Sequence, residues 1–160
     1  MTPNTRAILA LLAALLLPAG AAFAQQQFHA RHIYNENADA RAEIHDALST
    51  AASEHKRVIL DFGGNWCGDC QVLDIYFHQP PNATILDASF ILVEIDIGHY
   101  DHNVDVADKY QVPLKRGVPA LAVLDSNGRL LYSQKTGEFE DMRHMDPGSV
   151  TRFLDQWKVK

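Results

Sequence analysis

The only two cysteines of this 160-residue chain, Cys67 and Cys70, stand three positions apart. A disulfide stabilises a fold mainly by closing a long loop of the unfolded chain, so a bridge across two intervening residues gains little. A Cys-x-x-Cys pair that stands alone therefore indicates redox chemistry or half of a metal site. In redox exchange one thiolate attacks a disulfide, and the second thiol then attacks the first sulfur and releases the product.

The residues on either side of the pair predict how the two thiols are positioned. The apolar run 58–60, which two glycines follow shortly afterwards, predicts a buried central strand. The stretch 67–79 predicts a helix that two successive prolines terminate. A thiol in the first turn of a helix faces unpaired backbone N–H groups and the positive end of the helix dipole, which favours the thiolate. We therefore interpret Cys67 as the attacking thiol and Cys70 as its resolving partner.

The remainder of the chain predicts alternating helices and strands. Periodicity places helices at 37–55, 83–88, 104–110 and 147–157, and strands at 90–97, 120–124 and 129–132. Asn37 would cap the first helix, with Asp39 in its first turn. Asn127-Gly128 between the last two strands is a strong hairpin signal. This order predicts one α/β domain in which helices flank both faces of a mixed central sheet.

The first 24 residues are interpreted as a signal peptide outside this fold. Arg6 supplies a positive start, and the apolar run 8–17 is too short to span a bilayer comfortably. Small residues precede an expected cleavage after Ala24. The prediction is then an N-terminal arm at 25–36 and a periplasmic domain at 37–160, without stable membrane insertion after cleavage. An uncleaved membrane anchor is the alternative.

The charge composition of the chain argues against some classes of binding partner. The chain has 20 acidic and 14 basic residues, a formal net charge of −6, and no cluster of lysines or arginines. Nucleic acid and anionic membrane surfaces are therefore not expected partners. With 47% hydrophobic residues, 160 residues suffice for one domain with a real core. The only redox group expected is the Cys67–Cys70 disulfide itself, with no other cofactor.

The segment DFGGNWCGDC at 61–70 resembles the thioredoxin superfamily, whose signature Trp-Cys-Gly-Pro-Cys reads here Trp-Cys-Gly-Asp-Cys. Asp61 stands six residues before Cys67, where thioredoxins carry a buried carboxylate that accepts a proton from the resolving cysteine. The resemblance implies a thioredoxin-like three-layer sandwich, with Cys67 and Cys70 as the redox pair. It also implies that Asp61 is the general base, with a pKa raised by desolvation. An aspartate that merely caps the loop at the strand end is the alternative.

The segment 116–120 is similar to the family's Arg-Gly-Ile-Pro-Thr loop, in which the proline is cis and faces the cysteines. By this resemblance Pro119 is cis and the backbone of Val118 pairs with an extended substrate. An ordinary trans proline before a strand is the alternative. On the same surface Gly68 would leave room for a substrate backbone. Trp66 would shield the site from one side, or else simply pack in the core.

The resemblance extends over about 58–157, including Gly128, Gly137 and the terminal helix. Within the superfamily the chain is similar to exported thioredoxin-like domains, among them the C-terminal domain of the membrane thiol:disulfide interchange protein. This implies a thiol–disulfide oxidoreductase whose partners are protein thiols and disulfides, and a membrane-embedded electron donor is a possible further partner.

Three positions depart from the family pattern. Asp69, which we also assign to the substrate-binding surface, replaces the thioredoxin proline, and its carboxylate should disfavour the Cys67 thiolate. We therefore expect a reductase-like protein rather than a strong oxidase. Leu92 occupies the strand position where bacterial thioredoxins carry a lysine near the buried aspartate. Residues 113–115 resemble a short insertion that would affect substrate choice.

Two functions of other classes remain open from the sequence. The cysteine pair could join imidazoles to hold copper or zinc. The candidate ligands are His29, His32, His78, His99 and His102. Alternatively, the disulfide is inert, and the groove around Trp66 and Val118 binds protein substrates without exchange.

Overall fold

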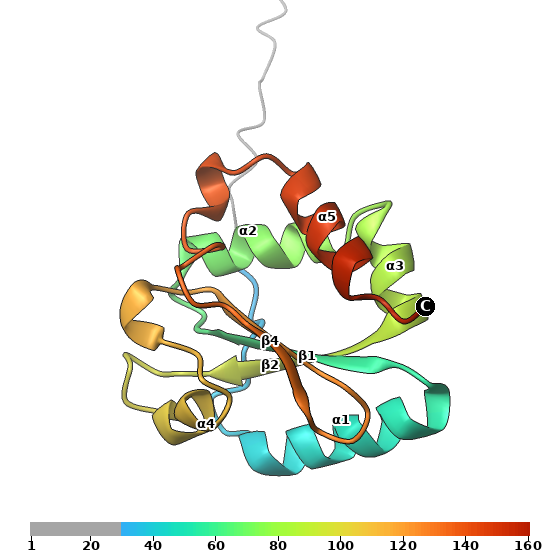
Figure 1. The fold of residues 1–160 in the computed structure, drawn as a ribbon. Helices are drawn as coiled ribbons and strands as arrows, with labels where there is room; N and C mark the ends of the chain where they lie inside the picture. Colours follow the sequence, from blue (N-terminus) through green and yellow to red (C-terminus); the bar gives the residue numbers. More distant parts are fainter. Residues whose placement is uncertain (1–29) are drawn as a thin grey trace, which may run out of the picture.

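A mixed four-stranded sheet lies at the centre of residues 30–160, the part of the chain that the computed structural model describes (Figure 1). Its strands are β1 (Arg57–Gly63), β2 (Phe90–Asp96), β3 (Ala120–Leu124) and β4 (Leu130–Ser133). Their order is β2-β1-β3-β4, with β1 and β2 parallel and the other two pairings antiparallel. The predicted signal peptide and residues 25–29 of the predicted arm lie outside the described residues.

Helices cover both faces of this sheet, as the two layers of coiled ribbon in Figure 1 show. One face carries α1 (Ala40–Glu54), with α4 (Val104–Lys109) beside it. The other carries α2 (Gly68–Phe77), α3 (Asn82–Ser89) and α5 (Gly148–Trp157). Two short 3₁₀ turns complete the described elements, η1 (Leu114–Arg116) and η2 (Met142–His144). The predicted three-layer arrangement around a mixed sheet is confirmed.

The alternation of side chains along β1 divides the core in two and places the buried carboxylate. Leu60 and Phe62 pack in the cluster under α1, whereas Ile59 packs in the cluster under α2. Because successive strand side chains point to opposite faces, Asp61 lies on the same face as Ile59. Asp61 is therefore under α2, the helix that begins at the cysteine pair.

The first two helices depart most from their predicted bounds. The prediction that Asn37 caps the first helix is wrong: α1 begins at Ala40, and the Asp39 carboxylate accepts hydrogen bonds from the Arg41 and Ala42 N–H groups at 3.0 and 3.2 Å. Asp39 satisfies N–H groups that the first turn leaves unpaired. The second helix, α2, ends at Phe77, before the two prolines. Its N-cap is Cys67, so the helix proper starts one residue later.

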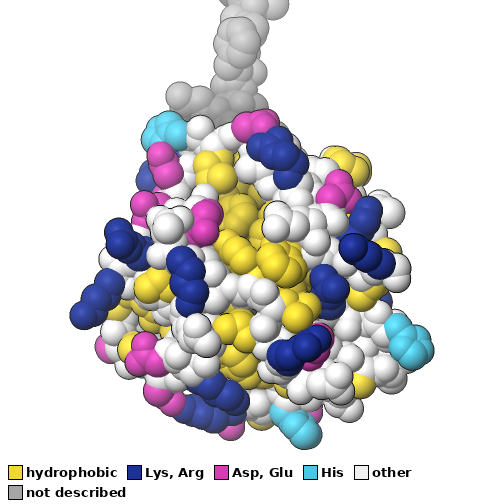
Figure 2. Space-filling model, in the orientation of Figure 1, with side chains coloured by type: hydrophobic (Ala, Val, Ile, Leu, Met, Phe, Trp, Pro, Cys, Tyr) yellow, Lys and Arg dark blue, Asp and Glu magenta, His cyan; other side chains and the backbone are white. Residues whose placement is uncertain are grey.

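The predicted hairpin is confirmed, since β3 and β4 pair antiparallel on either side of the turn at 125–128. Gly128 has φ 80°, a conformation that favours glycine. On the face drawn in Figure 2, cationic and anionic side chains are interspersed around a strip of hydrophobic ones. No helix within residues 30–160 combines the length and apolar character that a membrane crossing requires.

Candidate active site

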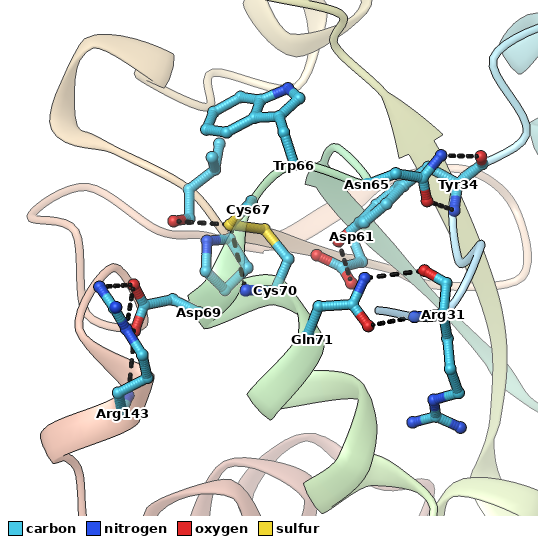
Figure 3. Close-up of a disulfide and its surroundings, with 12 residues drawn as sticks. Arg31, Tyr34, Asp61, Asn65, Trp66, Cys67, Asp69, Cys70, Gln71 and Arg143 are labelled. Atoms are coloured by element: carbon cyan, nitrogen blue, oxygen red, sulfur yellow. Dashed lines mark hydrogen bonds and ion pairs between the residues drawn. A yellow bond between two sulfur atoms is a disulfide. The ribbon is translucent and has the colours of Figure 1, made fainter. Parts of the chain in front are cut away.

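Cys67 and Cys70 form a disulfide at the start of α2 (Figure 3). Cys67 is the N-cap residue, and its Sγ accepts a hydrogen bond from the Cys70 N–H at 3.1 Å. The unpaired N–H groups of a helix start favour negative charge on such a sulfur. Cys67 retains 5% exposure and Cys70 has none. Another molecule can therefore approach Cys67, whereas Cys70 faces the interior.

The surface beside Cys67 is formed by the residues that the sequence assigns to substrate binding. The Val118–Pro119 peptide bond is cis, and the Val118 carbonyl oxygen lies 3.5 Å from Cys67 Sγ. Trp66 is 47% exposed, so the alternative that it packs in the core is wrong. Its Nε1 donates to the Gly98 carbonyl at 2.7 Å and its ring stacks on His99. The indole thus forms one rim of the opening at Cys67.

Asp69 points away from the disulfide towards Arg143 on η2 (Figure 3). Its Oδ1 accepts from the Arg143 backbone N–H and Nε at 3.0 and 3.1 Å, and its Oδ2 lies 2.9 Å from a terminal guanidinium nitrogen. Partial burial by itself would raise the pKa of Asp69, but the hydrogen bonds from Arg143 outweigh it and lower that pKa. A methyl group at Gly68 would lie 3.9 Å from the same guanidinium. A cation beside the motif therefore offsets the charge that we expected to disfavour the Cys67 thiolate.

Asp61 lies behind the pair, 1% exposed, and its Oδ2 accepts a hydrogen bond from the Tyr34 hydroxyl at 3.0 Å. Burial, followed by the negative charge of Glu94, raises the pKa of Asp61 to about 8, while the Tyr34 hydrogen bond acts in the opposite direction. The strand continues to Gly63, so Asp61 does not cap the loop. At neutral pH most Asp61 carboxyls hold a proton.

The residue opposite Asp61 on β2 is Glu94, whereas Leu92, two residues earlier, pairs with Ile59. A shift of two residues keeps the same face of the strand, so the side-chain alternation alone does not distinguish these two positions. The pKa of Glu94 is itself raised by burial. The neighbour of Asp61 across the sheet is thus a second acid.

Sequence reasoning missed the segment 31–36, which packs across the start of α2. Asn65 Oδ1 accepts from the N–H groups of Ile33 and Tyr34 at 2.9 and 3.0 Å, and Asn65 Nδ2 donates to the Tyr34 carbonyl at 2.8 Å. Gln71 exchanges two further hydrogen bonds with the backbone of Arg31. Two amide side chains close to the motif thus hold this segment in place.

Two side chains of that segment reach the face under α2. Tyr34 is 1% exposed and meets Asp61, and the Arg31 guanidinium pairs with Asp74 of α2. The available signals were weak: one aromatic residue in a polar stretch without periodicity, and amides flanking the cysteines. Neither signal indicates which residue, 27 to 40 positions away in the sequence, is the hydrogen-bond partner.

The candidate metal ligands do not gather around the cysteines in the part of the chain that the structure describes. Among residues 30–160 no group of three His, Cys, Asp or Glu side chains is placed to share a metal ion. His78 Nδ1 lies 2.8 Å from the Asp74 carbonyl, His99 stacks on Trp66, and His102 Nδ1 lies 3.2 Å from Asp96. His29 lies outside the described residues.

Comparisons with known proteins agree with this geometry. A family model described as Thioredoxin-like matches residues 39–126. The crystal structure of a disulphide isomerase from Xylella fastidiosa Temecula1 is 33% identical with a TM-score of 0.75, covering 80% of this chain and 98% of that one. These matches confirm the thioredoxin-like fold.

Two curated relatives align with the chain at lower identity. A thioredoxin from Mycoplasmoides gallisepticum is 29% identical over 91 residues, which are 57% of this chain and 73% of that protein. The thiol:disulfide interchange protein DsbD of Pseudomonas fluorescens is 26% identical over 119 residues. That alignment covers 72% of this chain but only 18% of the length of DsbD.

Proposed function

The chain belongs to the thioredoxin-like family, and from this premise we propose that it is a thiol–disulfide oxidoreductase acting through Cys67 and Cys70. The observation that carries the proposal is the asymmetry of its disulfide. Cys67 caps the start of α2 and keeps 5% exposure, whereas Cys70 has none and lies on the side of Asp61 (Figure 3). This arrangement suits a first thiolate that attacks a disulfide of a substrate protein, here called the client, and a second thiolate that releases the client.

In the reducing direction the reaction has two steps. The Cys67 thiolate attacks one sulfur of a client disulfide, and the other client sulfur leaves as a thiolate and takes a proton from solvent. The Asp61 carboxylate then accepts the Cys70 thiol proton, and the Cys70 thiolate attacks Cys67 Sγ. The Cys67–client bond breaks, the Cys67–Cys70 disulfide forms, and the second client sulfur leaves with the electron pair and takes a proton from solvent, to which Asp61 returns the Cys70 proton. Two electrons pass to the client, whose two sulfurs end as thiols.

Clients would bind along the opening at Cys67. The exposed Trp66 ring, the open surface over Gly68 and the backbone of Val118 beside Pro119 offer an extended peptide both an apolar rim and hydrogen-bonding groups. Asp69 would act indirectly, because its carboxylate is engaged by Arg143. Protein thiols and disulfides are thus the proposed partners.

A reductase-like protein fits the charges around Cys70 better than a strong oxidase. A strong oxidase stabilises its reduced, thiolate form. Here Asp61 faces Cys70, and its neighbours Glu94 and Asp74 are also acids. Burial among these acids disfavours a thiolate at Cys70 in the reduced protein and so favours the disulfide. Electrons would then have to be resupplied by a thiol donor.

The proposed location is the periplasm. It is supported by the predicted signal peptide, with cleavage after Ala24, and by the similarity to part of a thiol:disulfide interchange protein. The same similarity supports a membrane-embedded protein as the electron donor. We propose no cofactor beyond the disulfide, and the arm at 25–36 and the domain at 37–160 as the mature chain.

A trapping experiment tests the function. In a Cys70→Ser variant the second step is blocked, so mixed disulfides with protein clients should accumulate through Cys67, whereas the Cys67→Ser control should form none. Redox titration of the wild type against glutathione should give a potential nearer that of thioredoxin, about −270 mV, than that of DsbA, about −120 mV. The proposal fails if Cys70→Ser forms no adduct with any protein disulfide offered.

A further inference from the structure

We propose that Tyr34 is a positioning residue for proton transfer between Cys70 and Asp61, and that the segment 31–36 exists in part to deliver its hydroxyl to the buried carboxylate. This inference deepens the proposed function and rests on it for its chemical meaning. The hydrogen bond itself is independent of that function.

Tyr34, Asp61 and Cys70 meet in one small buried space. The Tyr34 hydroxyl donates to Asp61 Oδ2 at 3.0 Å, and both residues are 1% exposed (Figure 3). A methyl group at Gly63 would overlap the Tyr34 hydroxyl and approach Cys70 Sγ to 2.8 Å. The missing side chain of Gly63 thus leaves room for the hydroxyl and the sulfur together.

The other groups that face Asp61 are acids or apolar side chains. Glu94 lies opposite it on β2, Asp74 lies on α2, and Leu121 is its apolar neighbour on β3. Arg31, the cation of the segment, pairs with Asp74 rather than with Asp61. Asp61 Oδ1 has no hydrogen-bond partner within residues 30–160. Among these residues Tyr34 is therefore the one donor that stabilises the Asp61 carboxylate.

This arrangement assigns a separate task to each carboxylate oxygen. The hydroxyl engages Oδ2 and fixes the orientation of the carboxyl group, which leaves Oδ1 available for the proton from Cys70. Stabilising the carboxylate also lowers the pKa of Asp61 from the higher value that burial among acids would impose. Tyr34 thus brings the base closer to working pH without touching a substrate.

The backbone hydrogen bonds around Tyr34 explain how a residue outside the main elements achieves this. Asn65 binds the N–H and the carbonyl of Tyr34, and Gln71 binds Arg31 three residues earlier. Asn65 lies two residues before Cys67 and Gln71 one residue after Cys70. The segment is therefore anchored on both sides of the redox motif whose proton chemistry its tyrosine serves.

A conservative variant separates the hydroxyl from the packing. Tyr34→Phe in the full chain removes the hydroxyl only, and Tyr110→Phe removes a hydroxyl from another buried tyrosine of the same cluster. In the oxidised proteins the Asp61 carboxyl is titrated by ¹³C NMR, with Asp61→Asn identifying its signal. We expect the pKa of Asp61 to rise by about one unit in Tyr34→Phe, as for loss of a hydrogen bond to a charged group, and to stay unchanged in Tyr110→Phe.

The exchange reaction gives the second measurement. A rise of about one unit lowers the ionised fraction of Asp61 at pH 7 about tenfold. Release of client from the mixed disulfide should slow by that factor in Tyr34→Phe and recover at higher pH, while alkylation of Cys67 stays at the wild-type rate. A purely structural role for Tyr34 would not move the pH profile in this way.

The two proposals can fail separately. If wild type and variants exchange no disulfide, the proposed function fails, yet the Asp61 titration still shows whether Tyr34 acts on it. If that titration is the same in Tyr34→Phe and wild type, the positioning role is overturned. Should Tyr34→Phe prove unstable, the wild type with a ¹³C label at Tyr34 Cζ gives the same test: that signal must shift as Asp61 titrates, and a Cζ signal that does not follow Asp61 overturns the positioning role.

Discussion

The two sulfurs of the disulfide have different electrostatic surroundings. Beside Cys67, the carboxylate of Asp69 is paired with the exposed guanidinium of Arg143, so the local charges nearly cancel. Behind Cys70, Asp61 is buried beside a second acid, Glu94, and a hydroxyl group is its hydrogen-bond donor. The surface side is balanced by an ion pair, and the interior side carries an excess of acid.

This difference shows how one motif can separate two chemical tasks. Charges at the surface are screened by water and salt, so the Cys67 side should respond to ionic strength and change little in energy. On the buried side desolvation governs ionisation, so small changes should have large effects there. Variants of matched type on the two sides test this contrast.

The largest contrast is expected for Asp61→Asn, which removes the proposed base. Release of client from the mixed disulfide should slow about 100-fold at pH 7, a typical loss for a general base. The first attack by Cys67 should stay within about twofold of wild type, because Asp61 faces the other sulfur. Stopped-flow measurement of the two steps checks this, and equal slowing of both would break the comparison.

The same variant should also change how the stability of the protein depends on pH. The pKa of Asp61 is raised to about 8 from an ordinary value near 3.8, so folding favours its protonated form. That contribution is complete below about pH 4 and is lost as pH rises towards 8. Asp61→Asn should therefore gain stability over wild type between pH 4 and 8, by on the order of a few kcal/mol. Urea unfolding of both oxidised proteins at the two pH values measures the gain.

Asp69→Asn provides the control of opposite sign. The folded-state pKa of Asp69 is lowered, so its carboxylate contributes stability above its ordinary pKa that is lost as pH falls through the lower, folded-state value. This variant should be less stable than wild type at pH 7 and approach it in acid. The same sign of pH dependence for both aspartates would contradict the described difference.

The next largest contrast is expected between alanine substitutions at two neighbouring glycines, Gly63 and Gly64, in their effect on the free energy of unfolding. Ala at Gly63 would meet the buried Tyr34 hydroxyl and Cys70 Sγ, neither of which has room to move, so Gly63→Ala should cost about 1–3 kcal/mol of unfolding free energy. Ala at Gly64 would meet Trp66 Nε1 at 2.6 Å, and that half-exposed ring can turn aside only by giving up its hydrogen bond to the Gly98 carbonyl. Gly64→Ala should therefore cost about 0.5–1 kcal/mol, less than Gly63→Ala. Thermal and urea unfolding compare them.

The smallest effect is expected from Arg143→Gln, on the surface side. The unpaired Asp69 charge should then reduce the thiolate fraction of Cys67 and slow its alkylation at pH 7 about two- to fivefold at low salt. Arg143→Gln with Asp69→Asn should restore the rate, and Arg152→Gln, which removes a surface arginine paired with Asp146, should leave it unchanged. Failure of the double variant to recover would show that Arg143 acts otherwise than through Asp69.

The sequence predicts well what depends on local pattern. The apolar run before two glycines places β1, and the resemblance of 61–70 to the thioredoxin motif places Asp61 near the cysteines. The Asn-Gly dipeptide fixes the hairpin because its turn chemistry is local. These features require no knowledge of distant partners.

What escaped prediction depends on contacts across the chain. Whether Leu92 or Glu94 lies beside Asp61 is decided by strand register, which neither strand encodes alone. The pairing of Asp69 with Arg143 joins residues 74 positions apart. Tyr34 is buried because Gly63 leaves a gap for its hydroxyl, and an isolated tyrosine in a polar stretch carries no sign of such a gap.

The position of Tyr34 has a consequence for where the working unit begins. The stretch shared with the family starts at residue 39, so a protein trimmed to that boundary would keep the four strands, the disulfide and Asp61. It would lack the Tyr34 side chain, which is buried against Asp61. Water would then reach Asp61, so its carboxyl would ionise at lower pH. The shortened protein would keep the same fold, but the pKa of its buried aspartate would be lower.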